Sequence, residues 1–177
     1  MISVRTEKIC VIFTIFTILF STAFLMAPSI IMAQNSQPAV ARDNDAPDFE
    51  AQDLNGNTIT LHSFKGQRPV LLYFWASWCP YCMAVRPAVI NLRNEIDTKD
   101  LEIISVNAGG GDSLAKVKRF QEVHPAPYTT VYDGDSKVVQ RAYNVTGIPH
   151  FVLIDKNGSV KYRGSGLPPD LKGLIKQ

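Results

Sequence analysis

Hydrophobic runs of strand length alternate along this chain with segments of helical periodicity. The continuous apolar run at 69–75 is typical of a central strand buried on both faces, and 101–106 is a second buried strand. Between these runs, apolar residues recur at helical spacing and predict a helix from Cys79 to about Asp97. One face of that helix carries Val85, Val89, Leu92 and Ile96.

Shorter elements continue the alternation toward the carboxyl terminus. After the glycines at 109–111, Ser113 can cap a helix that runs to about Val123 and stops before Pro125. The remaining pattern predicts a strand at 129–132, a short helix at 136–143, a hairpin of strands 151–154 and 160–163, and a closing helix at 168–176.

A small hairpin precedes the first long strand. Its strands, 49–54 and 58–61, flank the sequence Asn55-Gly56-Asn57, in which Asn-Gly supplies the positive φ of a tight turn. Strands that alternate with helices, together with the late hairpin, predict an α/β fold. Its central mixed sheet should carry helices on both faces.

Residues 1–33 have the composition of an export segment. Basic residues precede an uncharged apolar run at 9–27, and polar residues follow Ala33. This order is typical of a signal peptide cleaved near Ala33, but the run is also long enough to remain as a membrane anchor. Either alternative places the rest of the chain in a periplasmic or other extracytoplasmic compartment. We expect 34–46 to be a linker and 47–177 to be the folded domain.

Composition narrows the class of protein. The chain has 177 residues, a formal net charge of +2 and three cysteines. The length suits one domain, the cysteines are too few for a disulfide scaffold, and the near-neutral charge gives no reason to expect nucleic acid as a partner. Cys10 falls within the leader, so the exported domain keeps one pair, Cys79 and Cys82.

That pair lies where a buried strand gives way to a helix, in the sequence Trp78-Cys79-Pro80-Tyr81-Cys82. Backbone N–H groups and the positive end of the helix dipole favour a thiolate at Cys79, and Cys82 lies almost one turn further on. We therefore predict a redox-active disulfide, with Cys79 as the exposed nucleophile and Cys82 as the shielded resolving thiol. Pro80 suits the first turn of the helix.

Two other roles for the cysteines stay open at this point. A structural zinc site needs a second pair of ligands, and His62, His124 and His150 show no ligand spacing, so we expect no metal. A static structural disulfide would close only a short loop and gain little entropic stabilisation. Thiol–disulfide exchange is the favoured chemistry, and it needs no cofactor because the electrons reside in the cysteine pair.

Short motifs between 46 and 164 carry a resemblance to a known family. They are Ala46-Pro47-Asp48-Phe49, Asp53-Leu54-Asn55-Gly56, Lys65-Gly66, the run at 74–82, Gly147-Ile148-Pro149 and Leu153-Ile154-Asp155-Lys156-Asn157-Gly158. This set resembles the thioredoxin superfamily, most of all its exported, membrane-tethered thiol:disulfide oxidoreductases, the branch of the TlpA, ResA and cytochrome-c-maturation proteins. The resemblance implies a thioredoxin fold, with the first hairpin as an amino-terminal extension.

The resemblance also implies contacts and partners. Pro149 would be a cis-proline facing the disulfide, and Trp78, Pro80, Tyr81 and Ile148 would join it in contacting the substrate. The expected partners are protein dithiols or disulfides and a membrane electron donor or acceptor, with the protein itself a monomer. Members of the tethered branch usually reduce their substrates, so the resemblance favours a reductant, with cytochrome c maturation as one such role.

Several positions depart from the family pattern. Tyr73 stands where thioredoxin has a buried Asp, and Val85 stands where many cytochrome-c-maturation members have Glu. Both acids are linked to proton transfer with the buried thiol, so that step must use another group or water here. His150 follows Pro149 where many relatives have Thr. As a titrating group close to the sulfurs it is a candidate to stabilise the Cys79 thiolate, but we favour contact with substrate or packing.

Two alternative functions on the same scaffold remain. A thiol peroxidase shares the opening motif, but Ala76 stands where its peroxidatic motif needs Thr. A copper or haem chaperone would be a binding protein rather than an enzyme. Copper-delivering relatives separate their cysteines by three residues and add a distant His, whereas Cys79 and Cys82 are separated by two.

Overall fold

The computed structural model describes residues 44–176, which belong to the compact unit Ala41–Gln177. The predicted signal or anchor segment and nearly all of the predicted linker lie outside the described residues. Within 44–176, no helix is long and apolar enough to cross a membrane.

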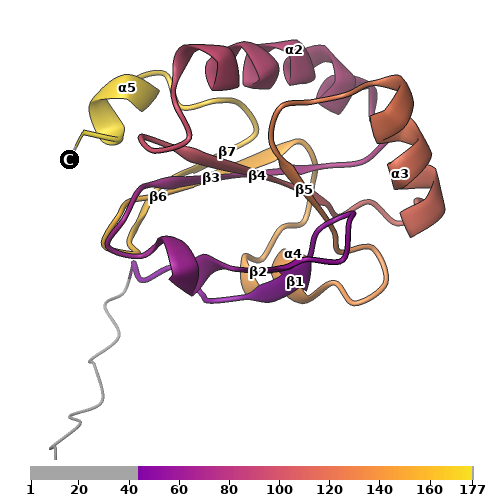
Figure 1. Ribbon diagram of the computed structural model, residues 1–177, viewed down its shortest axis with the longest axis horizontal. Helices are drawn as coiled ribbons and strands as arrows, with labels where there is room; N and C mark the ends of the chain where they lie inside the picture. The colour runs from indigo at the N-terminus through magenta and orange to yellow at the C-terminus, as the bar shows by residue number, and fades with distance from the viewer. Residues whose placement is uncertain (1–43, 177) are drawn as a thin grey trace, which may run out of the picture. The chain divides into compact units, whose positions relative to one another are not determined.

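A five-stranded mixed sheet forms the centre of the domain (Figure 1). Its strands are β3 Val70–Trp75, β4 Glu102–Asn107, β5 Thr129–Tyr132, β6 His150–Ile154 and β7 Val160–Gly164. They lie in the order β5-β4-β3-β6-β7. Strands β3, β4 and β5 are parallel, whereas β6 is antiparallel to both of its neighbours, β3 and β7. The predicted central mixed sheet is confirmed.

The middle strand, β3, brings the cysteine motif to one end of the sheet. All of its residues are buried, as its continuous apolar run predicts for a strand covered on both faces. Its register pairs Phe74 with His150 of β6 and Trp75 with Asn107 of β4. The segment that follows Trp75 therefore starts between the beginning of β6 and the end of β4.

Helices cover both faces of the sheet (Figure 1). On one face lie α2 Pro80–Glu95, α3 Leu114–Val123 and α5 Leu171–Leu174. On the other lie α4 Val138–Ala142, the 3-10 helix η1 Leu61–Phe64, and the hairpin of β1 Glu50–Gln52 and β2 Thr58–Thr60. Because side chains alternate along β3, Leu71 and Tyr73 belong to the core under α2, and Leu72 and Phe74 to the core over α4.

The helix predictions hold in type and differ in length. Ser113 caps α3 as predicted, since its hydroxyl accepts a hydrogen bond from the Lys116 N–H. The closing helix predicted over 168–176 is only the four-residue α5, because Asp170 caps a turn that begins after the two prolines. The helix predicted over 136–143 is only α4, because Lys137 has a left-handed φ of 50° and cannot belong to it.

The predicted amino-terminal hairpin is confirmed, with shorter strands. Strands β1 and β2 are antiparallel, and Gly56 in their turn has a φ of 89°. The outer residues of the predicted strands leave the pair: Asp53 bridges to Val131 of β5, and Leu61 opens η1. The hairpin is thereby connected to the β5 edge of the main sheet.

Candidate active site

The two cysteines close a disulfide at the amino terminus of α2. Cys79 is the N-cap residue, Pro80 occupies the first turn, and the Cys82 N–H donates to Cys79 Sγ at 3.1 Å. A free helix amino terminus offers unpaired N–H groups and a positive dipole end, which stabilise negative charge on sulfur. The arrangement can therefore stabilise a thiolate at Cys79 once the disulfide is opened.

Both sulfur-bearing side chains are buried in the disulfide form. Cys82 is 0% exposed, as predicted, but Cys79 is only 3% exposed, so the prediction of an exposed Cys79 is wrong for this state. The sulfur of Cys79 lies 3.9 Å from the carbonyl oxygen of Ile148, which closes one side of it. The surface around the pair is instead presented by Trp78 and Tyr81, which are 53% and 78% exposed.

A proline loop faces the disulfide across that contact. The Ile148–Pro149 peptide bond is cis, and it lies immediately before β6. Because Phe74 of β3 pairs with His150 of β6, the loop is delivered to the same end of the sheet as the cysteines. The placement that the resemblance implied for Pro149 is thus observed, and its contact with a substrate stays a prediction.

A groove of about 810 Å³ runs beside the loop. Its lining consists of Tyr81, Ala84, Val85 and Ala88 from α2, together with Thr146, Gly147, Ile148, Pro149, His150 and Ser165. Three of the predicted substrate contacts, Tyr81, Ile148 and Pro149, line this groove, whereas Trp78 and Pro80 do not. No acidic side chain lines it, because Val85 occupies the position of the family acid.

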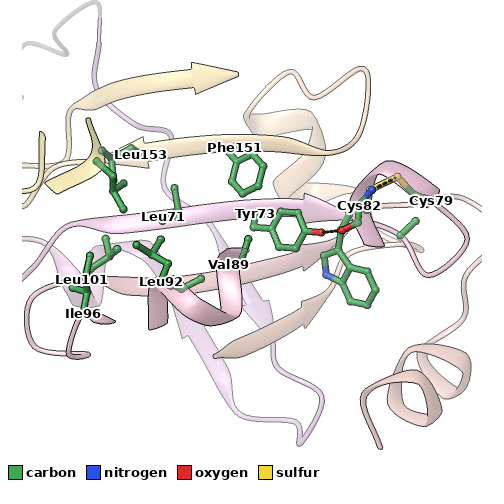
Figure 2. Close-up of a cluster of buried hydrophobic side chains, with 14 of the residues drawn as sticks. Leu71, Tyr73, Cys79, Cys82, Val89, Leu92, Ile96, Leu101, Phe151 and Leu153 are labelled. Atoms are coloured by element: carbon green, nitrogen blue, oxygen red, sulfur yellow. Dashed lines mark hydrogen bonds between the residues drawn. A yellow bond between two sulfur atoms is a disulfide. The ribbon is translucent and has the colours of Figure 1, made fainter. Parts of the chain in front are cut away.

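Tyr73 contacts Cys82 directly (Figure 2). Its hydroxyl donates to the carbonyl oxygen of Cys82 at 2.8 Å, and its ring stacks on Phe151 at a centroid distance of 4.9 Å. Burial raises the pKa of the Tyr73 phenol well above its usual value. The phenol therefore stays protonated and donates a hydrogen bond to the backbone. A carboxylate at this position could accept a proton, and the phenol does not replace it in that role.

His150 lies between the proline loop and the core. Its ring meets Phe74 edge-on at 6.2 Å, and it lines the groove. Burial lowers the pKa of His150, and the positive charge of Arg163 lowers it further. The neutral imidazole is thus favoured at neutral pH, so His150 offers the groove a hydrogen-bonding group without a permanent charge.

One residue near the site escaped the sequence analysis. The carboxylate of Asp112 accepts hydrogen bonds from both the backbone N–H and the hydroxyl of Ser77, two residues before Cys79. The two residues are 35 positions apart, and no motif or periodicity joins them. The sequence around Asp112 shows only that an acidic residue follows the three glycines at 109–111.

Metal ligands do not gather in the part of the chain that the structure describes. Among residues 44–176 there is no group of three or more His, Cys, Asp or Glu side chains that could hold a metal ion. The expectation of a metal-free, cofactor-free protein stays a prediction.

Fold and site together define the class of protein as a thioredoxin-like thiol-disulfide oxidoreductase. The chain belongs to the AhpC/TSA family, whose model matches residues 43–163. It is 37% identical over 123 residues to the thiol-disulfide oxidoreductase ResA of Geobacillus kaustophilus, covering 70% of this chain and 68% of that protein. It is 33% identical over 122 residues to ResA of Bacillus subtilis, covering 69% of this chain and 66% of that one. The matches thus span about two thirds of these relatives' lengths.

Solved structures agree on the fold. The thioredoxin domain of a thiol-disulfide oxidoreductase from Bacteroides vulgatus superposes with a TM-score of 0.63 at 27% identity, covering 77% of this chain and 99% of that one. The MTB protein dsbF, solved in mixed oxidized and reduced forms, gives a TM-score of 0.60 at 26% identity, covering 74% and 92%. The predicted thioredoxin fold is confirmed.

Proposed function

We propose that the protein reduces disulfides of other proteins outside the cytoplasmic membrane. The observation that supports this most is the placement of Cys79 Sγ at the N-cap of α2, where it accepts the Cys82 N–H. This geometry suits a nucleophilic thiolate with its resolving partner one turn away. The exposed aromatic side chains Trp78 and Tyr81 beside it suit contact with another protein rather than with a small thiol.

The proposed cycle starts from the reduced pair. The Cys79 thiolate attacks one sulfur of the substrate disulfide, and the other substrate sulfur leaves as a thiolate that takes a proton from water. Cys82 then loses its proton and attacks Cys79 Sγ, which releases the second substrate thiol and leaves the Cys79–Cys82 disulfide. A membrane-bound dithiol donor would return two electrons and one proton to the pair and its second proton to water, itself becoming a disulfide.

The direction of electron flow is part of the proposal. It is supported by the resemblance to the tethered reductants and is tested by the reduction potential of the Cys79–Cys82 pair. A value of about −270 mV would support a reductant, whereas one of about −120 mV would indicate an oxidant. A peptide containing the cysteine pair of an apocytochrome c is the first substrate to try, because the branch includes cytochrome-c-maturation proteins.

The cysteine assignments make the largest testable prediction. In a protein-disulfide reduction assay, Cys79→Ser should abolish turnover because the nucleophile is gone. Cys82→Ser should instead accumulate a mixed disulfide between Cys79 and the substrate, visible as a mass increase that dithiothreitol removes. Full turnover by the Cys79→Ser protein would refute the mechanism, and tight stoichiometric copper binding without reductase activity would favour the chaperone.

A further inference from the structure

Asp112 is a buried carboxylate that reaches the turn before Cys79. Its side chain is fully buried, and it follows the glycines at 109–111. Oδ2 accepts the Ser77 N–H at 2.8 Å and the Asn107 Nδ2–H at 2.8 Å, and Oδ1 accepts the Ser77 hydroxyl at 2.6 Å. Lys116 completes the set, with Nζ 2.9 Å from Oδ1.

Those contacts keep the carboxylate ionised. Although burial raises the pKa of Asp112, the hydrogen bonds from Ser77 and Asn107 outweigh it and lower the pKa below its usual value. A buried charge is costly unless it is paired and hydrogen-bonded, and here the donors are Ser77 in the turn, Asn107 at the end of β4 and Lys116 in α3. The contact is therefore specific to this arrangement of β4, α3 and the turn.

The turn at 76–78 is also held by a backbone hydrogen bond and by packing. It lies between the end of β3 and the start of α2, and within it the Cys79 N–H donates to the Ala76 carbonyl oxygen at 3.2 Å. Below it, Gly109 approaches so closely that an added Cβ would lie 2.1 Å from Ala76 Cβ and 3.2 Å from Trp78 Nε1. The loop at 109–112 thus supports the turn by packing and holds it through Ser77.

We infer that Asp112 is a positioning residue for the redox site: through Ser77 it fixes the turn that places Cys79 Sγ at the helix N-cap. Asp112 binds both the N–H and the hydroxyl of Ser77, and two residues further on Cys79 Sγ accepts the Cys82 N–H, so the turn is held on both sides of Trp78. The expected effect of Asp112 on turnover rests on the proposed function, whereas its expected effect on the reactivity of Cys79 does not.

A positioning role and a purely electrostatic role of Asp112 predict opposite shifts in the pH dependence of Cys79 reactivity, so an experiment can separate them. If Asp112 acts by positioning, Asp112→Ala loosens Cys79 from the N-cap, destabilises its thiolate and moves the midpoint of its reaction profile to higher pH. If Asp112 acts only through its negative charge, the same variant removes a repulsion and moves that midpoint to lower pH. Ser77→Ala keeps the carboxylate and removes one bond, so positioning predicts a smaller shift in the same upward direction.

The test measures alkylation of Cys79 by iodoacetamide as a function of pH. The full-length chain carries Cys10→Ser and Cys82→Ser throughout, so that Cys79 is the single thiol. We expect Asp112→Ala to raise the midpoint and to slow alkylation at neutral pH about tenfold, the scale of a lost hydrogen bond to a charged group. Asp112→Asn, which keeps an oxygen acceptor for the Ser77 N–H, should recover part of the rate.

Asp133 provides a matched control. It is also a buried aspartate, and it accepts the Val139 N–H and the Ser136 hydroxyl at 3.1 Å each and the Gln140 N–H at 2.7 Å, over the opposite face of the sheet. Asp133→Ala should lower the thermal midpoint as Asp112→Ala does, yet leave Cys79 alkylation unchanged. A purely structural role for Asp112 predicts equal effects of the two variants on alkylation.

The alkylation results test the positioning role of Asp112 independently of the proposed function. Unchanged or faster alkylation in folded Asp112→Ala, or an effect no larger than that of Asp133→Ala, overturns it. If Asp112→Ala does not fold, Asp112→Asn and Ser77→Ala answer the same question through their shift in midpoint. Because alkylation needs no protein substrate, a wild-type protein that fails to reduce disulfides would refute the proposed function and leave this result standing.

Discussion

The two cysteines of one disulfide lie in different surroundings. Cys82 lies in an apolar and aromatic core, and the Tyr73 hydroxyl donates to its backbone carbonyl (Figure 2). Val85 of α2 packs against the same core. Cys79 follows a polar turn that is anchored by the buried carboxylate of Asp112. Both cysteines are buried, but the Cys79 side is joined to a polar turn, whereas the Cys82 side is held by the Tyr73 hydroxyl and by packing.

In the proposed cycle, the attack by Cys79 and the resolution by Cys82 therefore depend on different parts of the molecule. Polar contacts and the helix amino terminus favour the thiolate on the Cys79 side, whereas an apolar enclosure favours the neutral thiol on the Cys82 side. With no acid at Tyr73 or Val85, the proton of Cys82 must leave to water or to the departing substrate thiolate. We therefore expect the resolving step to be the slower half and the more sensitive to added bases.

Among the changes on the Cys82 side that keep both cysteines, the addition of an acid should have the largest effect. Val85 lines the groove and is packed against the core beside Cys82, so Val85→Glu places a carboxylate where it can accept the proton of the resolving thiol. We expect resolution to accelerate by about a hundredfold at neutral pH, the lower end of general acid–base catalysis, with the rate of attack by Cys79 unchanged.

The measurement follows a chromophoric aromatic disulfide in a Cys10→Ser background. Release of the first aromatic thiolate reports attack by Cys79, and release of the second reports resolution by Cys82. Ala88→Glu, one turn further along the same groove, is the control. Equal acceleration by both variants would mean that general charge, and not proximity to Cys82, controls the step.

Removing one hydroxyl from the Cys82 side should have a moderate effect. Tyr73→Phe leaves the stacked ring in place and deletes the donor to the Cys82 carbonyl, so the free energy of unfolding should fall by about 1 kcal/mol. Tyr143→Phe is the matched control, because its hydroxyl donates to the Pro47 carbonyl at 2.7 Å on the other face of the sheet.

Urea unfolding compares the stabilities, and the two-phase release assay compares the cysteines. Both variants should lose similar stability, and only Tyr73→Phe should alter the second phase. A second phase that is identical in wild type and Tyr73→Phe would show that the bond to Cys82 serves stability alone.

The smallest expected effect concerns His150. Burial lowers its pKa, so the unfolded chain binds the proton more readily than the folded protein does. The contribution of neutral His150 is thus fully present above about pH 6.5 and is lost as the pH falls through the folded value. His150→Gln should flatten the dependence of the urea midpoint on pH in that acidic window, and an unchanged slope would assign the dependence to other groups.

Local signals were sufficient for the elements that build the sheet. The apolar run at 69–75 predicted β3 because a strand buried on both faces has no polar positions to interrupt it. Ser113 predicted the start of α3 because capping depends on neighbouring residues only. The predicted lengths of short elements such as α5 were too great, because the ends of such elements depend on caps and on packing more than on periodicity.

The chemistry could be predicted from neighbouring residues: a cysteine pair at helical spacing, at the junction of a buried strand and a helix, within an α/β fold. The way in which that pair is held could not be predicted. The burial of Cys79 beside Ile148, the hydroxyl of Tyr73 on Cys82 and the carboxylate of Asp112 on Ser77 join residues from different elements. Spacing and propensity report on neighbours along the chain, whereas these contacts depend on the register of β3 with β4 and β6, which brings distant segments to one end of the sheet.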